Sequence, residues 1–278
     1  MPSQHLRGTV WNMMYITFGV RQDNPLCDWM ANIGLAFTVI AGTYSLFQPA
    51  PYGRYSSPKF GPTIPAKTAW IIQESPAFIV PILVVLTTPH VQLSNAPNAI
   101  ALSLFLLHYL NRTFIFPFAL PEQVKPIPIP TIFSAFFFCA YNGFLQGHHL
   151  ANAYRIESSG FAETVGISMF FLGMWINIKH DGILMNLKRE AGTDSEGNTD
   201  YEIPTGGLFE LISGANYFGE ILEWWGLALY TGGYPQIAFA TFANTFLSIR
   251  AFHHHRWYKE KFGSAYPSER KAIIPFVF

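Results

Sequence analysis

Charged side chains are scarce in this 278-residue chain. Asp, Glu, Lys and Arg make up 12% of it, against about 25% in a typical soluble domain. The 17 basic and 17 acidic residues cancel, which leaves no basic excess for nucleic acid. Cysteine is scarce too: Cys27 and Cys139 are too few for a disulfide framework or a cysteine metal site. These shortages exclude a soluble globular enzyme, a secreted disulfide-rich protein and a nucleic-acid-binding protein.

Sequence motifs for metals and dinucleotides are missing as well. The residues His253–His255 are consecutive, and neighbours on a helix point about 100° apart, so these three cannot chelate one ion. No H-E-x-x-H motif occurs, and we expect no metal. The Gly206–Gly207 pair does not belong to a G-x-G-x-x-G fingerprint after a strand. Any nucleotide site must therefore be built from side chains on helices.

Apolar and aromatic residues are abundant instead, at 50% and 17% of the chain. They gather in segments near the roughly 20 residues that cross a bilayer, which predicts an all-α polytopic membrane protein with seven transmembrane helices around a cofactor and substrate cavity. The seven segments are 27–47, 68–87, 98–118, 129–149, 161–178, 206–230 and 235–252. Thr9–Val20 is too short to span and is predicted as an interfacial helix. We expect residues 1–26 to form an extension and 27–278 a single membrane domain.

The basic residues predict the orientation in the membrane. With seven spans, 13 of the 17 lie on the side of the C-terminus, three lie on the other side, and Arg112 is inside a span. Cytoplasmic loops carry the excess of Lys and Arg, so the C-terminus is expected in the cytoplasm, at a bacterial inner membrane or the endoplasmic reticulum. No internal repeat supports a transporter built from inverted repeats. We expect a monomer in the lipid bilayer.

Two groups of polar residues interrupt the apolar segments. Gln73 and Glu74 lie in the middle of the second segment, where burial favours the neutral acid, a hydrogen-bond donor. A structural bond between helices is the alternative for Glu74. His108, Tyr109 and Arg112 share a region of the third segment at helical spacing. Arg112 suits an anion, although it could instead reach the membrane surface.

Polar residues also recur at helical spacing near the cytoplasmic side of three later segments. These stripes are Asn177, Asp181 and Lys188; Ser213, Asn216, Glu220 and Glu223; and Arg250, His254 and Tyr258. Such stripes predict a wet cavity open to the cytoplasm. Its mixture of carboxylates, amides and basic groups suits a ligand with phosphates, ribose hydroxyls and a nucleobase. An ion pore would be lined by charges of one sign.

At these residues the chain resembles the steroid 5α-reductases, the 3-oxo-5α-steroid 4-dehydrogenases. The resemblance runs from about residue 27 to the C-terminus. It rests on the blocks AWIIQESP (69–76), HYLNRTF (108–114), NGFLQG (142–147), GGLFE (206–210), SGANYFGEILEW (213–224), RAFHHHR (250–256) and RKAIIPFVF (270–278).

The resemblance implies a seven-helix reductase that takes NADPH from the cytoplasm and a 3-oxo-4-ene steroid from the bilayer. The steroid would lie mainly among the first four helices, and NADPH among the last three and the cytoplasmic loops. The implied catalytic residues are Gln73, Tyr109 and a protonated Glu74, with donors aimed at the 3-oxygen, where enolate charge develops. The implied cofactor residues are Arg54, Trp70, Arg112, Lys125, Asn177, Asp181, Lys188, Asn216, Glu220, Glu223, His254, Tyr258 and Arg270.

Other functions stay open at this point. Related membrane reductases act on a non-steroid enone, an enoyl-CoA or a polyprenol, and a distantly similar methyltransferase would need S-adenosylmethionine. A proton-coupled transporter could use Glu74. The Gln73–Glu74 pair and the His108–Tyr109 block favour reduction of the C4–C5 double bond of a steroid to a 5α-dihydro product.

Overall fold

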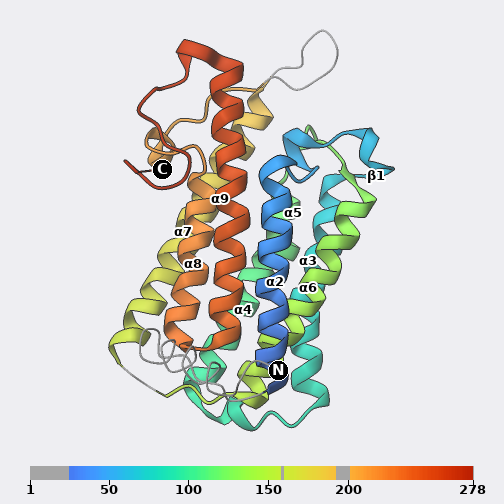
Figure 1. Cartoon of the computed structure of the whole chain (residues 1–278), viewed down its shortest axis with the longest axis vertical. Coiled ribbons are helices and arrows are strands. Elements are labelled where there is room, and N and C mark those ends of the chain that lie inside the picture. The colour runs from blue at the N-terminus through green and yellow to red at the C-terminus, as the bar shows by residue number, and fades with distance from the viewer. Residues whose placement is uncertain (1–24, 158–159, 192–200, 278) are drawn as a thin grey trace, which may run out of the picture.

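A computed structural model describes residues 25–157, 160–191 and 201–277. The predicted interfacial helix Thr9–Val20 lies outside the described residues. The described chain is mostly helical, with one short two-stranded ribbon (Figure 1). Its α-helices and strands are α2 (Pro25–Phe47), β1 (Thr63–Ile64), α3 (Ala66–Thr87), α4 (Ala96–Leu110), α5 (Phe116–Ala119), β2 (Ile127–Pro128), α6 (Ile129–His148), α7 (Phe161–Glu190), α8 (Ala215–Thr231) and α9 (Tyr234–Phe262).

Seven long helical segments are thus present in the described part, counting α4 to α5 as one. Four of them, namely α2, α3, Ala96–Ala119 and α7, are long and apolar enough to cross a membrane. An all-α membrane protein is therefore supported. The other three long helices, α6, α8 and α9, fall short of that standard of length and composition.

One segment boundary was wrong. The predicted segment 206–230 starts too early, because Gly206 and Gly207 have φ values of 90° and 58° and a right-handed helix cannot pass through them. Residues Gly207–Glu210 form a single 3-10 turn, and α8 begins at Ala215. Helices α7 and α9 continue 12 and 10 residues beyond the ends of the predicted membrane segments at 178 and 252. Hydropathy detects only the apolar part of a helix, whereas the helical spacing of the polar residues beyond it indicates the extension.

Glycines allow α7 and α8 to pack backbone against backbone. A Cβ atom added to Gly166 would lie 2.6 Å from the backbone nitrogen of Tyr230, and one added to Gly226 would lie 2.5 Å from that of Phe170. About two turns further along α7, a Cβ atom added to Gly173 would overlap the backbone at Gly219, and one added to Gly219 would overlap the backbone at Gly173. Small residues drive close packing between membrane helices. This contact brings the polar stripe of α7 directly against that of α8.

Helices α3 and α6 form a second close pair. The ribbon holds the first residues of the two helices side by side, because β1 precedes α3, β2 precedes α6, and Thr63 of β1 pairs with Pro128 of β2 in antiparallel register. Further along, Gly147 of α6 packs on Pro81, where a Cβ would approach the proline Cα to 2.8 Å. Figure 1 shows this pair on one side of the molecule and α7, α8 and α9 on the other, with the ribbon and the C-terminus at the same end.

Candidate active site

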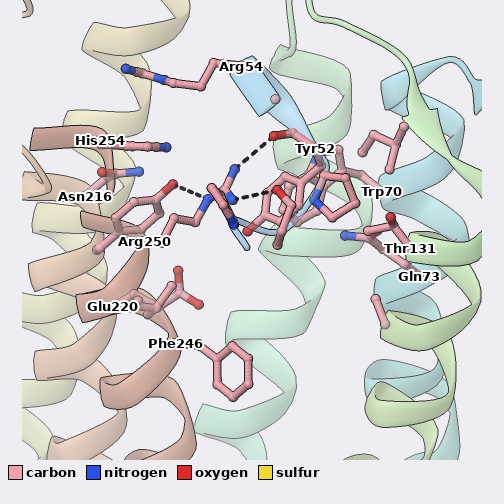
Figure 2. Close-up of a pocket in the computed structure, with 18 of the residues that line it drawn as sticks. Tyr52, Arg54, Trp70, Gln73, Thr131, Asn216, Glu220, Phe246, Arg250 and His254 are labelled. Carbon is pink, nitrogen blue, oxygen red and sulfur yellow. Dashed lines mark hydrogen bonds between the residues drawn. The ribbon is translucent and has the colours of Figure 1, made fainter. Parts of the chain in front are cut away.

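A cavity of about 770 Å³ lies between these two groups of helices. Residues from α2, α3, α6, α7, α8 and α9 line it, together with the segment that leads from α4 to α5. Figure 2 shows Asn216, Glu220 and His254 on one wall facing Trp70 and Gln73 on the other. Segments far apart in the sequence therefore contribute to one site.

One part of the cavity is apolar and aromatic. Phe37 of α2, Phe138 of α6 and Phe242 of α9 line it. The rings of Phe138 and Phe242 stack with centroids 4.0 Å apart, and Phe37 stacks on both. Aromatic rings favour such stacked contacts. This part is suited to a rigid hydrocarbon ligand.

An acid and a phenol lie beside the apolar part. Gln73 Nε2 donates to Glu74 Oε1 over 3.2 Å, and Cys139 Sγ faces Glu74 Oε2 at 3.8 Å. The Tyr109 ring is 4% exposed and is held by Phe105, with centroids 4.8 Å apart. All but Phe105 of these residues line the cavity, so the predicted acid–tyrosine pair shares one chamber.

A π-helical turn, Asn111–Ile115, interrupts the helix just after Tyr109. Such turns are frequent at functional sites. Arg112 lies within it, 9% exposed, and pairs with Asp181 Oδ2 at 3.1 Å. Its guanidinium also lies over the rings of Trp70 and Phe116, at 4.8 and 4.3 Å. Arg112 therefore faces the interior and does not reach for the membrane surface.

The stripes of α7 and α8 form one hydrogen-bond network. Asn216 Nδ2 donates to Asp181 Oδ1 over 2.8 Å, and Asn177 Nδ2 donates to the Asn216 carbonyl over 3.0 Å. Beside them His108 Nδ1 lies 2.9 Å from Glu223 Oε1. Buried polar groups need such partners. The network holds Asp181 and Asn216 against the cavity.

Arg250 lies at the centre of the site and holds the loop that follows α2 (Figure 2). Its guanidinium donates to the carbonyl of Tyr52 over 3.2 Å and to the Tyr217 hydroxyl over 2.9 Å. It also lies 3.5 Å from the centre of the Tyr52 ring. Burial raises the pKa of Tyr52 to about 12, although Arg250 opposes this shift. The Tyr52 phenol is therefore neutral at pH 7.

Several cations at this end have no acidic partner. Among the described residues, no carboxylate lies within ion-pair distance of Arg54, Lys125, Lys188 or Arg250, all of which line the cavity. Arg54 Nη1 and Lys188 Nζ are buried without a hydrogen-bond partner in the described part of the chain. Unpaired buried cations are costly. An anionic ligand would relieve that cost.

Comparison with known proteins identifies the family. Residues 125–278 match the family model described as 3-oxo-5-alpha-steroid 4-dehydrogenase. The chain is 42% identical over 230 residues to 3-oxo-5-alpha-steroid 4-dehydrogenase 1 of Macaca fascicularis, covering 82% of this chain and 84% of the relative. It is 40% identical over 252 residues to 3-oxo-5-alpha-steroid 4-dehydrogenase 2 of Sus scrofa, and 41% over 252 to that of Homo sapiens, each covering 88% of this chain and 95% of the relative. The chain belongs to the 3-oxo-5-alpha-steroid 4-dehydrogenase family.

Most residues expected from the family resemblance lie around the one cavity. Those lining it are Arg54, Trp70, Gln73, Glu74, Tyr109, Arg112, Lys125, Asp181, Lys188, Asn216, Glu220, His254 and Tyr258. Asn177 and Glu223 lie behind this wall, between α7 and α8 or against His108. Arg270 is 2% exposed and donates to the Pro204 carbonyl over 3.0 Å, away from the cavity surface. These three can act on a ligand only through their neighbours.

Sequence reasoning placed Arg250 on a stripe predicted to face the cavity but did not include it among the cofactor residues; it lines the cavity together with His254 and Tyr258. Tyr52 and Thr131 also line the cavity, and nothing in their sequence surroundings marks them. Ser213 was expected on the face of α8, but it precedes that helix and bonds the Tyr266 hydroxyl at 2.6 Å.

Proposed function

We propose that this protein is an NADPH-dependent steroid 5α-reductase, which reduces the C4–C5 double bond of a 3-oxo-4-ene steroid. The observation that carries the proposal is the arrangement of the cavity. Its aromatic part suits a steroid, its cationic part suits a phosphorylated cofactor, and Glu74 and Tyr109 lie in the same chamber. The family membership supports the same activity.

The reaction needs one hydride and one proton. When bound, the reduced nicotinamide supplies the hydride to C5, and a proton adds at C4, so the double bond becomes single. Negative charge develops on the 3-oxygen during hydride attack, and donors aimed at that oxygen stabilise the transition state. Tyr109 and the neutral acid of Glu74 are these donors in our proposal. Gln73, bonded to Glu74 over 3.2 Å, keeps the carboxyl oriented.

The residues present fit NADPH. Its phosphates are anionic, and Arg54, Lys125, Lys188 and Arg250 are the unpaired cations of the cavity among described residues. The amide, carboxylate and imidazole groups on the opposite wall can bind the ribose, nicotinamide and base. Those groups belong to Asp181, Asn216, Glu220 and His254, with Trp70, Arg112 and Tyr258 as further contacts. Asn177, Glu223 and Arg270 would support them from behind.

We also infer that all seven long helices cross the membrane with the C-terminus in the cytoplasm. The loop after α2, the chain between α5 and β2, and the C-terminal end of α7 lie at the end of the bundle that carries the C-terminus (Figure 1). These segments contain the basic residues Arg54, Lys125 and Lys188. Such an excess is expected on the cytoplasmic side. Residues 27–278 would then form one membrane domain, with the steroid entering from the bilayer. One chain contains every group used here, so a monomer is sufficient.

The test is NADPH oxidation by the detergent-purified protein across a panel of 3-oxo-4-ene steroids, with mass analysis of the products. We expect a product two mass units heavier with 5α configuration, and no reaction with steroids already saturated at C4–C5. Glu74→Gln should lose activity, whereas Glu260→Gln, at an exposed pair on α9, should not. Reduction of only a non-steroid enone, enoyl-CoA or polyprenol, or proton-coupled flux in proteoliposomes without product, would contradict the proposal.

A further inference from the structure

The NGFLQG block of α6 contains two buried amides that the proposed mechanism does not use. Asn142 is 2% exposed and Gln146 is 0% exposed. The glycines of the block pack on α3, but packing alone does not explain two amides there, because a buried amide without partners is costly.

An amide chain fixes the orientation of Asn142. Gln146 Nε2 donates to the Pro235 carbonyl over 3.0 Å, which identifies that atom as the nitrogen, since a carbonyl only accepts. Gln146 Oε1 accepts from Gln236 Nε2 over 2.6 Å. The same Gln146 nitrogen donates to Asn142 Oδ1 over 3.2 Å. The Asn142 oxygen therefore faces Gln146, and its amino group must point the other way.

That amino group is buried and makes no hydrogen bond among the described residues. Cys139, three residues earlier and so on the same face of α6, faces Glu74 at 3.8 Å and belongs to the same buried cluster as Tyr109. Cys139, Glu74 and Tyr109 also line the same cavity. This face of α6 is thus directed at the chamber that holds both proposed donors.

We propose that Asn142 is a positioning residue that donates its free amide hydrogen to the Tyr109 oxygen. Hydrogen bonds in a chain polarise one another in a low-dielectric interior, so this bond makes the phenol a stronger donor to the steroid 3-oxygen. It also fixes the direction in which the phenolic hydrogen points. The inference rests on the proposed role of Tyr109.

The experiment is a double-mutant cycle that measures kcat, KM for each substrate and the melting temperature. Asn142→Leu should lower kcat about tenfold, the effect of one hydrogen bond, with both KM values unchanged. In a Tyr109→Phe background, which has no phenol, Asn142→Leu should change kcat by less than about twofold. Asn152→Ala is the matched control, because that amide bonds Thr88 Oγ1 over 2.9 Å; its kcat should stay at the wild-type value.

Other outcomes would overturn either the Asn142 inference or the proposed mechanism. Equal loss of kcat in both backgrounds, or a fall in melting temperature with raised KM, would overturn the Asn142 inference and leave the role of Tyr109 intact. Near-normal turnover by Tyr109→Phe alone would overturn the proposed mechanism and the inference with it. Should Asn142→Leu fail to fold, Asn142→Ala removes the same hydrogen-bond donor with less bulk, and the same comparison of backgrounds applies.

Discussion

Replacing Arg112 by Met should destabilise the protein strongly. The Arg112–Asp181 pair has side chains only 11% exposed on each partner and a separation of 3.1 Å. Removing one member of a buried pair leaves the other charge without compensation, which costs about 3–5 kcal/mol. Arg112 also loses its contacts over Trp70 and Phe116. Asp181→Asn in the same chain should recover part of the loss, because no charge is then left buried.

The assay is equilibrium or thermal unfolding in detergent, with Arg256→Met as the matched control. Arg256 pairs with Glu260 at 3.5 Å, but these side chains are 59% and 67% exposed, and exposed pairs contribute about 0–1 kcal/mol. We expect a fall in melting temperature of several degrees for Arg112→Met and almost none for the control. Equal small shifts for both variants, or no recovery by Asp181→Asn, would refute the claim that Arg112 forms a buried, desolvated pair.

Three further predictions follow from the site and the packing. Glu74→Gln and Tyr109→Phe should each cut the reduction rate roughly 100- to 1,000-fold, as loss of an oxyanion donor does, with unchanged melting; rates within threefold of wild type would contradict this. Lys188→Gln should raise KM for NADPH at least several-fold and leave KM for the steroid unchanged; equal shifts in initial-rate assays would argue against a phosphate contact. Gly173→Leu should prevent folding, because its side chain would overlap the backbone of α8, whereas Gly182→Leu on the same helix meets nothing within 4 Å; equal yields in size-exclusion chromatography would contradict that packing.

The long helices could be predicted from the sequence because apolar runs of membrane length are rare in soluble proteins. Hydropathy does not mark their polar ends, because it does not separate a polar helix from a polar loop. Helix α7 continues to Glu190 through charged residues. Only the helical spacing of Asn177, Asp181 and Lys188 indicates this extension. The start of α8 was wrong because Gly206 and Gly207 adopt left-handed backbone, and glycine permits such a conformation without requiring it.

Much of the candidate site was predictable for a similar reason. Helical spacing places Asp181, Asn216 and His254 each on a defined face of its own helix, and all three line the cavity. Spacing cannot tell which side chains reach the cavity surface. Arg270 was expected among the cofactor residues but bonds the Pro204 carbonyl over 3.0 Å. Contacts between distant segments decide that, and no local pattern encodes them.

The sequence by itself determined the membrane class, the helical periodicity and the chemical types available to the site, because these depend on composition and on the geometry of a single helix. Only the tertiary structure decided which groups meet. Backbone contact at Gly173 and Gly219 brings two polar stripes together. Arg250 bonds the loop at Tyr52 across almost 200 residues of chain, and Gln146 of α6 bonds the Pro235 carbonyl at the start of α9. Such meetings depend on close packing of whole helices, which is a property of the folded molecule.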